Sequence, residues 1–290
     1  MSATKHQKEI GKILGFSNKR WEEIIAKDGD RYENMDPEQA KLYAIRMNII
    51  SNRLGIKLPA WKKICTGEPV LITLLPETIM DHINQNATVM NVSREKWIEL
   101  CRRAPRLFSY SKETLTDNFK TAISYLNNPQ SVPADVVQAF TPEQKIQFKE
   151  FAGITVSEEK YKSYCTNNPQ ALSYTPEKML ENMMGLYSMF KGLGFFKKKE
   201  ITLSDFSNYL TEAQETVKMR HLYWCHQFHQ TGEKLNKSQT FQYIKKDDVM
   251  TDLNLAIKNE TGMIYEKVPD IIKHYPCPFM LRIKDARQRS

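Results

Sequence analysis

Apolar side chains recur along this chain with the spacing of helices that bury one face. In four segments an apolar residue precedes an aromatic residue by five positions, and Ile or Cys follows the aromatic residue four positions later. This spacing places the aromatic side chain and the Ile or Cys that follows it on one side of a helix. The aromatic residues are Trp21, Trp61, Trp97 and Tyr161, and the residues that follow them are Ile25, Cys65, Cys101 and Cys165. Each segment therefore predicts an amphipathic helix, and Ser93 and Ser157 are candidate side-chain caps at two of the starts.

A proline lies eight residues after three of the four aromatic side chains. These prolines are Pro69, Pro105 and Pro169, and the first segment has Gly29 at the same distance. Because proline lacks an amide hydrogen and clashes with the preceding turn, it ends a helix. We therefore predict that each first helix ends just before this position and that a short extended link follows. The links contain Leu71, Leu107 and Leu172.

A second amphipathic helix is predicted after each link. Proline and glutamate favour the first turn of a helix, and they stand together in Pro76-Glu77 and Pro176-Glu177. Apolar residues then recur on one helical face. They are Leu115, Phe119, Ile123 and Leu126 in one helix, and Met179, Met183, Leu186 and Phe190 in another. Each unit thus reads as a helix, a proline, a link and a second helix.

Neither helix of such a pair can bury its apolar face alone, so the pairs must stack on one another. We predict an all-α protein: a curved α-solenoid of degenerate two-helix repeats with proline-terminated first helices. The alternative is an ordinary helical bundle in which the prolines coincide by chance. The predicted regions are an N-terminal extension (1–13), helical repeats (14–196), a divergent helical segment (197–258), and a C-terminal partial repeat with a basic tail (259–290).

Two segments carry the pattern most clearly, residues 97–109 (WIELCRRAPRLFS) and 161–173 (YKSYCTNNPQALS). Together with Leu-Gly at residues 14–15 and 54–55, they resemble the repeat of the mitochondrial transcription termination factor (mTERF) family. The resemblance covers most of residues 14–190 and recurs at 262–289. It implies a solenoid that binds nucleic acid along a basic concave groove, without catalysis, in organelle transcription, replication or ribosome assembly. A bacterial protein with mTERF-like repeats that acts in a host cell fits equally well.

The charge balance favours an anionic partner. The chain has 42 Lys and Arg against 34 Asp and Glu, a formal net charge of +8, and such a surplus is typical of proteins that bind polyanions. We predict a nucleic-acid-binding protein, for DNA or RNA, whose basic groove holds the phosphate backbone. The candidate contacts are Lys62, Lys63, Arg102, Arg103, Arg106, Lys112, Lys197, Lys198, Lys199, Arg282 and Lys284. Each of these also suits a solvated surface, and a protein–protein interaction scaffold is the alternative function.

Catalytic and metal-binding motifs are absent from the sequence. It contains no GxGxxG, GxxxxGK[ST], HExxH or GxSxG pattern. The one cluster of metal-like ligands is His221, Cys225 and His229, at successive turns of a predicted helix. These turns span about 12 Å, too far for one ion without other ligands. We therefore predict a protein that is not an enzyme and that has no cofactor or bound metal.

Cysteine usage and hydropathy bear on location. The five cysteines form no CxxC pair, which favours a reducing, intracellular compartment. No apolar run reaches the roughly 18 residues of a membrane helix. Residues 1–9 lack the apolar segment of a secretory signal and the Arg-rich character of a transit peptide. We expect no membrane association and a cytoplasmic location by default, with an organelle or a host cell as alternatives.

Overall fold

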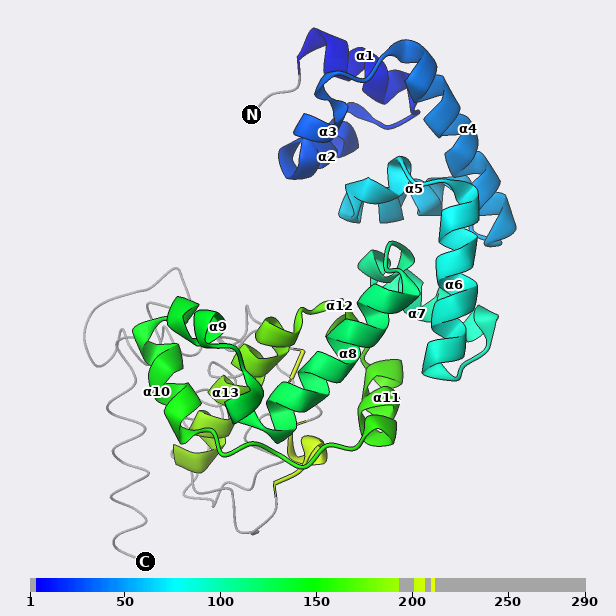
Figure 1. Ribbon diagram of the computed structural model, residues 1–290. Coiled ribbons are helices and arrows are strands. Elements are labelled where there is room, and N and C mark those ends of the chain that lie inside the picture. Colours follow the sequence, from blue (N-terminus) through cyan, green and yellow to red (C-terminus); the bar gives the residue numbers. More distant parts are fainter. Residues whose placement is uncertain (1–3, 193–200, 207–209, 212–290) are drawn as a thin grey trace, which may run out of the picture. The chain divides into compact units, whose positions relative to one another are not determined.

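The computed structural model describes residues 4–192, 201–206 and 210–211, and these residues are mostly helical (Figure 1). Within these ranges the only β-type pairing is an isolated bridge between Thr155 and Thr202. The prediction of an all-α fold is therefore confirmed. Several predicted features lie outside the described residues: Lys197, Lys198, Lys199, Arg282, Lys284, the cluster at His221, Cys225 and His229, and the regional boundaries at residues 196 and 258.

The chain divides into two compact units. Unit 1 comprises Met1–Ser131 and Val156–Met179, and unit 2 comprises Val132–Thr155 and Leu180–Ser290. The elements of unit 1 are α1 (Lys5–Ile13), α2 (Asn18–Asp28), α3 (Asp30–Glu33), α4 (Pro37–Arg53), α5 (Leu58–Gly67), η1 (Pro69–Ile72), α6 (Pro76–Met90), α7 (Arg94–Arg103), η2 (Pro105–Phe108), α8 (Lys112–Asn127), η3 (Pro129–Ser131), α11 (Glu158–Asn167) and α12 (Gln170–Ser173). The predicted N-terminal extension thus forms a helix, α1, which Thr4 caps.

Helices of unit 1 that follow one another in the sequence also pack together. The first helices α2 and α5 are in contact, and α5 also contacts η2. The second helices α4, α6 and α8 form a similar series of contacts, which begins with α1: α1 contacts α4, α4 contacts α6, and α6 contacts α8. Figure 1 shows α2 and α5 on one side of this unit, with α4 and α6 on the other. The two series are joined because α4 packs on α5 and α6 packs on α7.

The prolines end the first helices as predicted. Helix α5 stops two residues before Pro69, α7 stops two residues before Pro105, and α11 stops two residues before Pro169. In the first segment Gly29 has an ordinary helical conformation (φ −62°) and ends α2, and the single turn α3 follows directly. The helix stops could therefore be read from the sequence.

The links after the prolines are not extended, which corrects the prediction. Residues 69–72 and 105–108 form 3₁₀ turns, and residues 170–173 form a single helical turn. Proline fixes φ near the helical value, so it readily starts a new turn. The amide of each link leucine closes this turn by donating to a carbonyl three residues earlier, for Leu71 (3.2 Å), Leu107 (3.0 Å) and Leu172 (3.1 Å). The turn buries the leucine side chains.

The predicted helix starts are present too. Ser93 and Ser157 cap α7 and α11, each accepting a hydrogen bond from an amide three residues later. Pro76 begins α6, and Pro176 begins the helix Pro176–Gly192. Such caps satisfy amide groups that have no partner inside the helix.

The aromatic residues of the predicted helices form the core of unit 1. Trp21, Trp61, Trp97 and Tyr161 are at most 2% exposed. Trp61 packs edge-on against Phe108 of η2 (5.2 Å between ring centres), so a first helix contacts the link of the next segment. Cys65, Cys101 and Cys165 are fully buried free thiols, and burial raises the pKa of each.

Unit 2 has its own small core. Its described elements are α9 (Ala134–Ala139), α10 (Pro142–Glu150), η4 (Leu203–Asp205) and the part of α13 (Pro176–Gly192) from Leu180 onward. Phe151 packs edge-on against Tyr187 (5.2 Å between ring centres). The side-chain amide of Asn182 is buried and donates to the carbonyl of Leu210 (3.0 Å). The segment after Ser131 thus contains two short helices that belong to a different unit from the helices before it.

Candidate nucleic-acid interface

A basic groove lies between α2 and α5 on the surface of unit 1. Its volume is about 480 Å³. Four cationic side chains and one carboxylate line it, together with small polar residues. The lining residues are Ser17, Lys19, Arg20, Glu23, Lys27, Lys63, Thr66 and Gly67. In the region that the structure describes, this is a concave surface where positive charge exceeds negative charge, which suits an anionic ligand.

The packing of α2 on α5 builds the groove. Ser17 caps the start of α2, and the next turn presents Lys19 and Arg20. At the other end of α2, the Lys27 ammonium group donates to the carbonyls of Thr66 (3.0 Å) and Gly67 (3.2 Å) at the end of α5. A cation at a helix C-terminus is stabilised by the unpaired carbonyls there. Lys27 therefore holds the two walls together as well as lining the groove.

Lys63 is the predicted contact that lies in this groove. Lys63 is exposed on α5, and its role differs from that of the adjacent Lys62. The Lys62 ammonium group donates to the carbonyl of Gly15 (2.9 Å) and lies over the ring of Phe16 (5.7 Å to its centre). Partial burial lowers the pKa of Lys62. Lys62 thus anchors α5 to the turn after α1 and does not line the groove.

The predicted arginine cluster lies at the end of α7 and on η2. Arg102 is exposed in the last turn of α7. Its neighbour Arg103 donates from Nη2 to the carbonyl of Asn167 (2.9 Å), at the end of α11. Arg106 lies over the ring of Tyr110 (5.8 Å to its centre). Lys112 is exposed at the first position of α8.

Arg103 and Lys27 occupy equivalent positions, six residues after Trp97 and Trp21 respectively. Each donates to carbonyls at the end of the first helix of a later segment. The equivalent residues on the accepting helices are Gly67 and Asn167, whose side chains are not cationic. We call these two contacts the helix-end links. They show that one position of the sequence pattern serves packing between segments.

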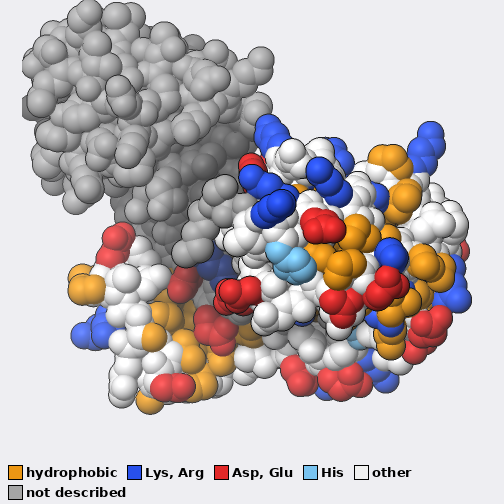
Figure 2. Space-filling view, turned by 90° about the horizontal axis from the view of Figure 1, so that it is seen from above, with side chains coloured by type: hydrophobic (Ala, Val, Ile, Leu, Met, Phe, Trp, Pro, Cys, Tyr) orange, Lys and Arg blue, Asp and Glu red, His pale blue; other side chains and the backbone are white. Residues whose placement is uncertain are grey.

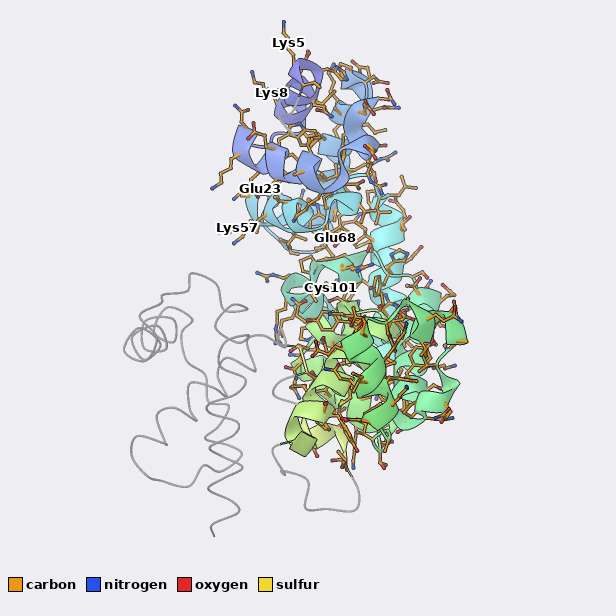
Figure 3. The ribbon with its side chains drawn as sticks, turned by 90° about the vertical axis from the view of Figure 1, so that its left-hand side faces the viewer. Lys5, Lys8, Glu23, Lys57, Glu68 and Cys101 are labelled. Carbon is orange, nitrogen blue, oxygen red and sulfur yellow. The ribbon has the colours of Figure 1, made fainter. Side chains whose placement is uncertain are left out.

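Glu68, between α5 and η1, is close to one cation of the groove and one of the arginine cluster. Burial raises the pKa of this carboxyl, while the nearby charges of Arg106 and Lys27 act in the opposite direction. Both cations are thus close enough to Glu68 to affect its ionisation. Figure 3 shows Glu23, Glu68 and Cys101 in succession on α2, after α5 and on α7. The basic groove and the arginine cluster therefore lie on neighbouring elements of unit 1.

Lys19, Arg20 and Lys27 were not among the residues predicted from the sequence. Lys19 and Arg20 lie in the first turn of α2, whereas the predicted Arg102, Arg103 and Arg106 lie beside Pro105. A signal for Lys27 does exist, because it lies at the same distance from Trp21 as Arg103 does from Trp97. The groove itself depends on how α2 packs on α5, which the sequence pattern does not specify.

Along the described ranges, no group of three or more His, Cys, Asp and Glu side chains could hold a metal ion. Among the helices within those ranges, none has the length and apolar content that a bilayer-spanning segment requires. Comparison with known proteins gives no assignment, because no protein-family model matches the chain and no curated protein is significantly similar to it.

Proposed function

We propose that this protein binds nucleic acid, DNA or RNA, without catalysing a reaction, and that the groove between α2 and α5 contacts the phosphate backbone. The observation that carries the proposal is the lining of this groove by Lys19, Arg20, Lys27 and Lys63 against the single carboxylate of Glu23. Cationic side chains that neutralise phosphates release bound counterions, and this release drives binding to any sequence. Arg102, exposed in the last turn of α7, is a further cation of unit 1 outside the groove.

We also propose that unit 1 is a curved α-solenoid of mTERF-like two-helix repeats. The support is local: three segments share the order of helix, proline, short turn and helix. The equivalent helix-end links of Lys27 and Arg103 join successive segments in the same way. A stacked array presents equivalent positions along one surface, which would let a polyanion follow several segments.

The proposal predicts salt-sensitive binding. Four phosphate contacts give a slope of about −3 to −4 in a plot of log K against log salt concentration. We would measure fluorescence anisotropy of labelled single-stranded DNA, single-stranded RNA and duplex DNA, at about 50 mM and about 200 mM salt. Binding of at least one of them that weakens strongly at the higher salt is expected. No binding of any of them at low salt would contradict the proposal.

A charge-matched pair of variants locates the site. The double substitution Arg20→Ala and Lys63→Ala removes two groove cations, and we expect it to weaken binding by about tenfold at low salt. The control removes two exposed lysines on other helices, Lys120→Ala and Lys145→Ala. Both variants lower the net charge equally, so a general loss of positive charge affects them alike. Equal losses of affinity in the two variants would show that the groove is not the contact.

A further inference from the structure

Helix α4 has a second apolar face, whose large side chains stay partly exposed in the described part of the chain. Its inner face buries Ala40, Met47 and Ile50 in unit 1. Leu42, Ile45 and Ile49 follow each other at spacings of three and four residues, which places them in one stripe along the helix. By helical geometry this stripe lies opposite the buried face. We call these three residues the α4 stripe.

The exposure of the α4 stripe is unusual for this protein. Leu42, Ile45 and Ile49 are 45%, 59% and 36% exposed. Among the described residues, only two other large hydrophobic side chains are comparably exposed: Leu75, just before α6, and Ile146 on α10. On the face drawn in Figure 2, hydrophobic side chains lie at the surface among charged ones. Apolar side chains gathered on one exposed face mark interaction sites more often than scattered ones do.

The edges of the α4 stripe are basic. Arg46 and Arg53 flank it on one side, and Lys41 flanks it on the other. The one carboxylate on α4 is Glu38, in its first turn. The Arg46 guanidinium group lies over the ring of Tyr43 (5.3 Å to its centre), and its charge helps to lower the pKa of the Glu77 carboxyl on α6.

Two of the flanking cations already have surface partners. Arg53 pairs with Glu77 of α6 (3.0 Å), and Lys41 pairs with Glu38 (2.7 Å). The side chains of both pairs are largely exposed. Exposed ion pairs contribute at most about 1 kcal/mol, so these cations can exchange their partners for others at little cost.

The charges at the edges indicate what covers the stripe. In a two-fold contact between two copies of the protein, the same patch meets itself. The edges of two packed helices then face each other, and this places the cations of one α4 against those of the other. Like charges at such positions disfavour the pairing. A helix with an apolar stripe between carboxylate edges has the complementary charge.

We propose that the outer face of α4 is the docking site for an amphipathic helix of a partner protein, which packs an apolar stripe on Leu42, Ile45 and Ile49 and places Asp or Glu opposite Arg46, Arg53 and Lys41. The α4 stripe covers two helical turns, about 10 Å. Helices commonly bind to an apolar surface in this way, through anchors three, four and seven residues apart. This inference does not depend on the nucleic-acid groove, which lies on α2 and α5.

The test uses a peptide probe of about three heptads with Leu at positions a and d and Glu at positions e and g. Repulsion between the Glu side chains keeps the probe from pairing with itself. The full-length protein carries ¹³C-labelled methyl groups on Ile and Leu, and methyl NMR reports the contact. We expect the probe to shift the signals of Ile45 and Ile49 and to leave that of Ile146 unchanged. A probe with Lys in place of Glu should not bind.

Two matched substitutions separate the site from the rest of the surface. Ile45→Gln should weaken probe binding by about tenfold, whereas Ile146→Gln, at an equally exposed isoleucine of α10, should leave it unchanged. Arg46→Glu should weaken binding of the Glu probe. Neither Ile45→Gln nor Ile146→Gln should alter nucleic-acid binding, so the failure of one proposal is distinguishable from the failure of the other.

Several outcomes would overturn the inference. One is the absence of shifts at Ile45 and Ile49 at millimolar probe, and another is equal binding of the Lys probe. A third is self-association of the protein, detected by sedimentation equilibrium without probe and abolished by Ile45→Gln. This last result would show that a second copy covers the α4 stripe.

Discussion

At the scale of single residues, three equivalent turns depend on a left-handed backbone. Gly15, Gly55 and Asn91 lie six residues before Trp21, Trp61 and Trp97, and their φ angles are 73°, 64° and 54°. In each turn, the amide of the next residue donates to a carbonyl five residues earlier, at 2.9–3.0 Å. This is the Schellman arrangement that ends a helix. Glycine adopts it without steric cost, so Asn91 is the less favourable solution.

Substitutions at Asn91 test this reading. Asn91→Gly should raise the free energy of unfolding by about 0.5 kcal/mol, because glycine carries no Cβ. Asn91→Ala should lower it by about 1 kcal/mol, since alanine lacks the tolerance of asparagine for this conformation. Urea unfolding followed by circular dichroism measures both changes. A glycine variant less stable than the natural protein would show that the Asn91 side chain contributes more than its backbone conformation costs.

At the scale of helices and turns, the ends of the elements could be predicted and the links could not. Ser93, Ser157 and the prolines act on their own neighbourhood, through caps and missing amides. The turns after the prolines differ from the extended links that we predicted, because burying Leu71, Leu107 and Leu172 favours a closed turn. The groove between α2 and α5 depends on packing between segments. The sequence therefore indicates a basic surface but does not show that the groove lies between α2 and α5.

The two adjacent arginines at the end of α7 should differ in role. Arg103→Ala removes the helix-end link to Asn167 and should lower the free energy of unfolding by about 1 kcal/mol. Arg102→Ala should leave stability unchanged and weaken nucleic-acid binding, because Arg102 is exposed. Urea unfolding and fluorescence anisotropy on both variants separate the two effects. If both variants bind nucleic acid more weakly while their free energy of unfolding is unchanged, Arg103 acts as a ligand contact rather than as a link.

At the scale of the whole molecule, the functional features proposed above all belong to unit 1. It contains the groove, the arginine cluster and the α4 stripe. Its core also contains Cys65, Cys101 and Cys165, one in each of three segments. Because each segment carries its own buried thiol, the reactivity of each thiol shows whether its segment opens alone or together with the others.

Thiol labelling provides this test. In a chain that carries Cys225→Ser and Cys277→Ser, we expect no reaction with a thiol reagent at about pH 8. Burial raises the pKa of all three remaining thiols, so they stay protonated and inaccessible there. In urea all three should become reactive as the helical signal in circular dichroism is lost. Labelling of one thiol while that signal is unchanged would show that its segment opens on its own.

The helix-end link at Lys27 has a consequence for evolution. This lysine both joins α2 to α5 and lines the groove, so a substitution there affects folding and ligand affinity at once. Arginine could serve both purposes, because it keeps the charge and the reach. Among descendants of the same gene, we expect position 27 to alternate between lysine and arginine, while Lys19, which serves the groove alone, drifts more freely.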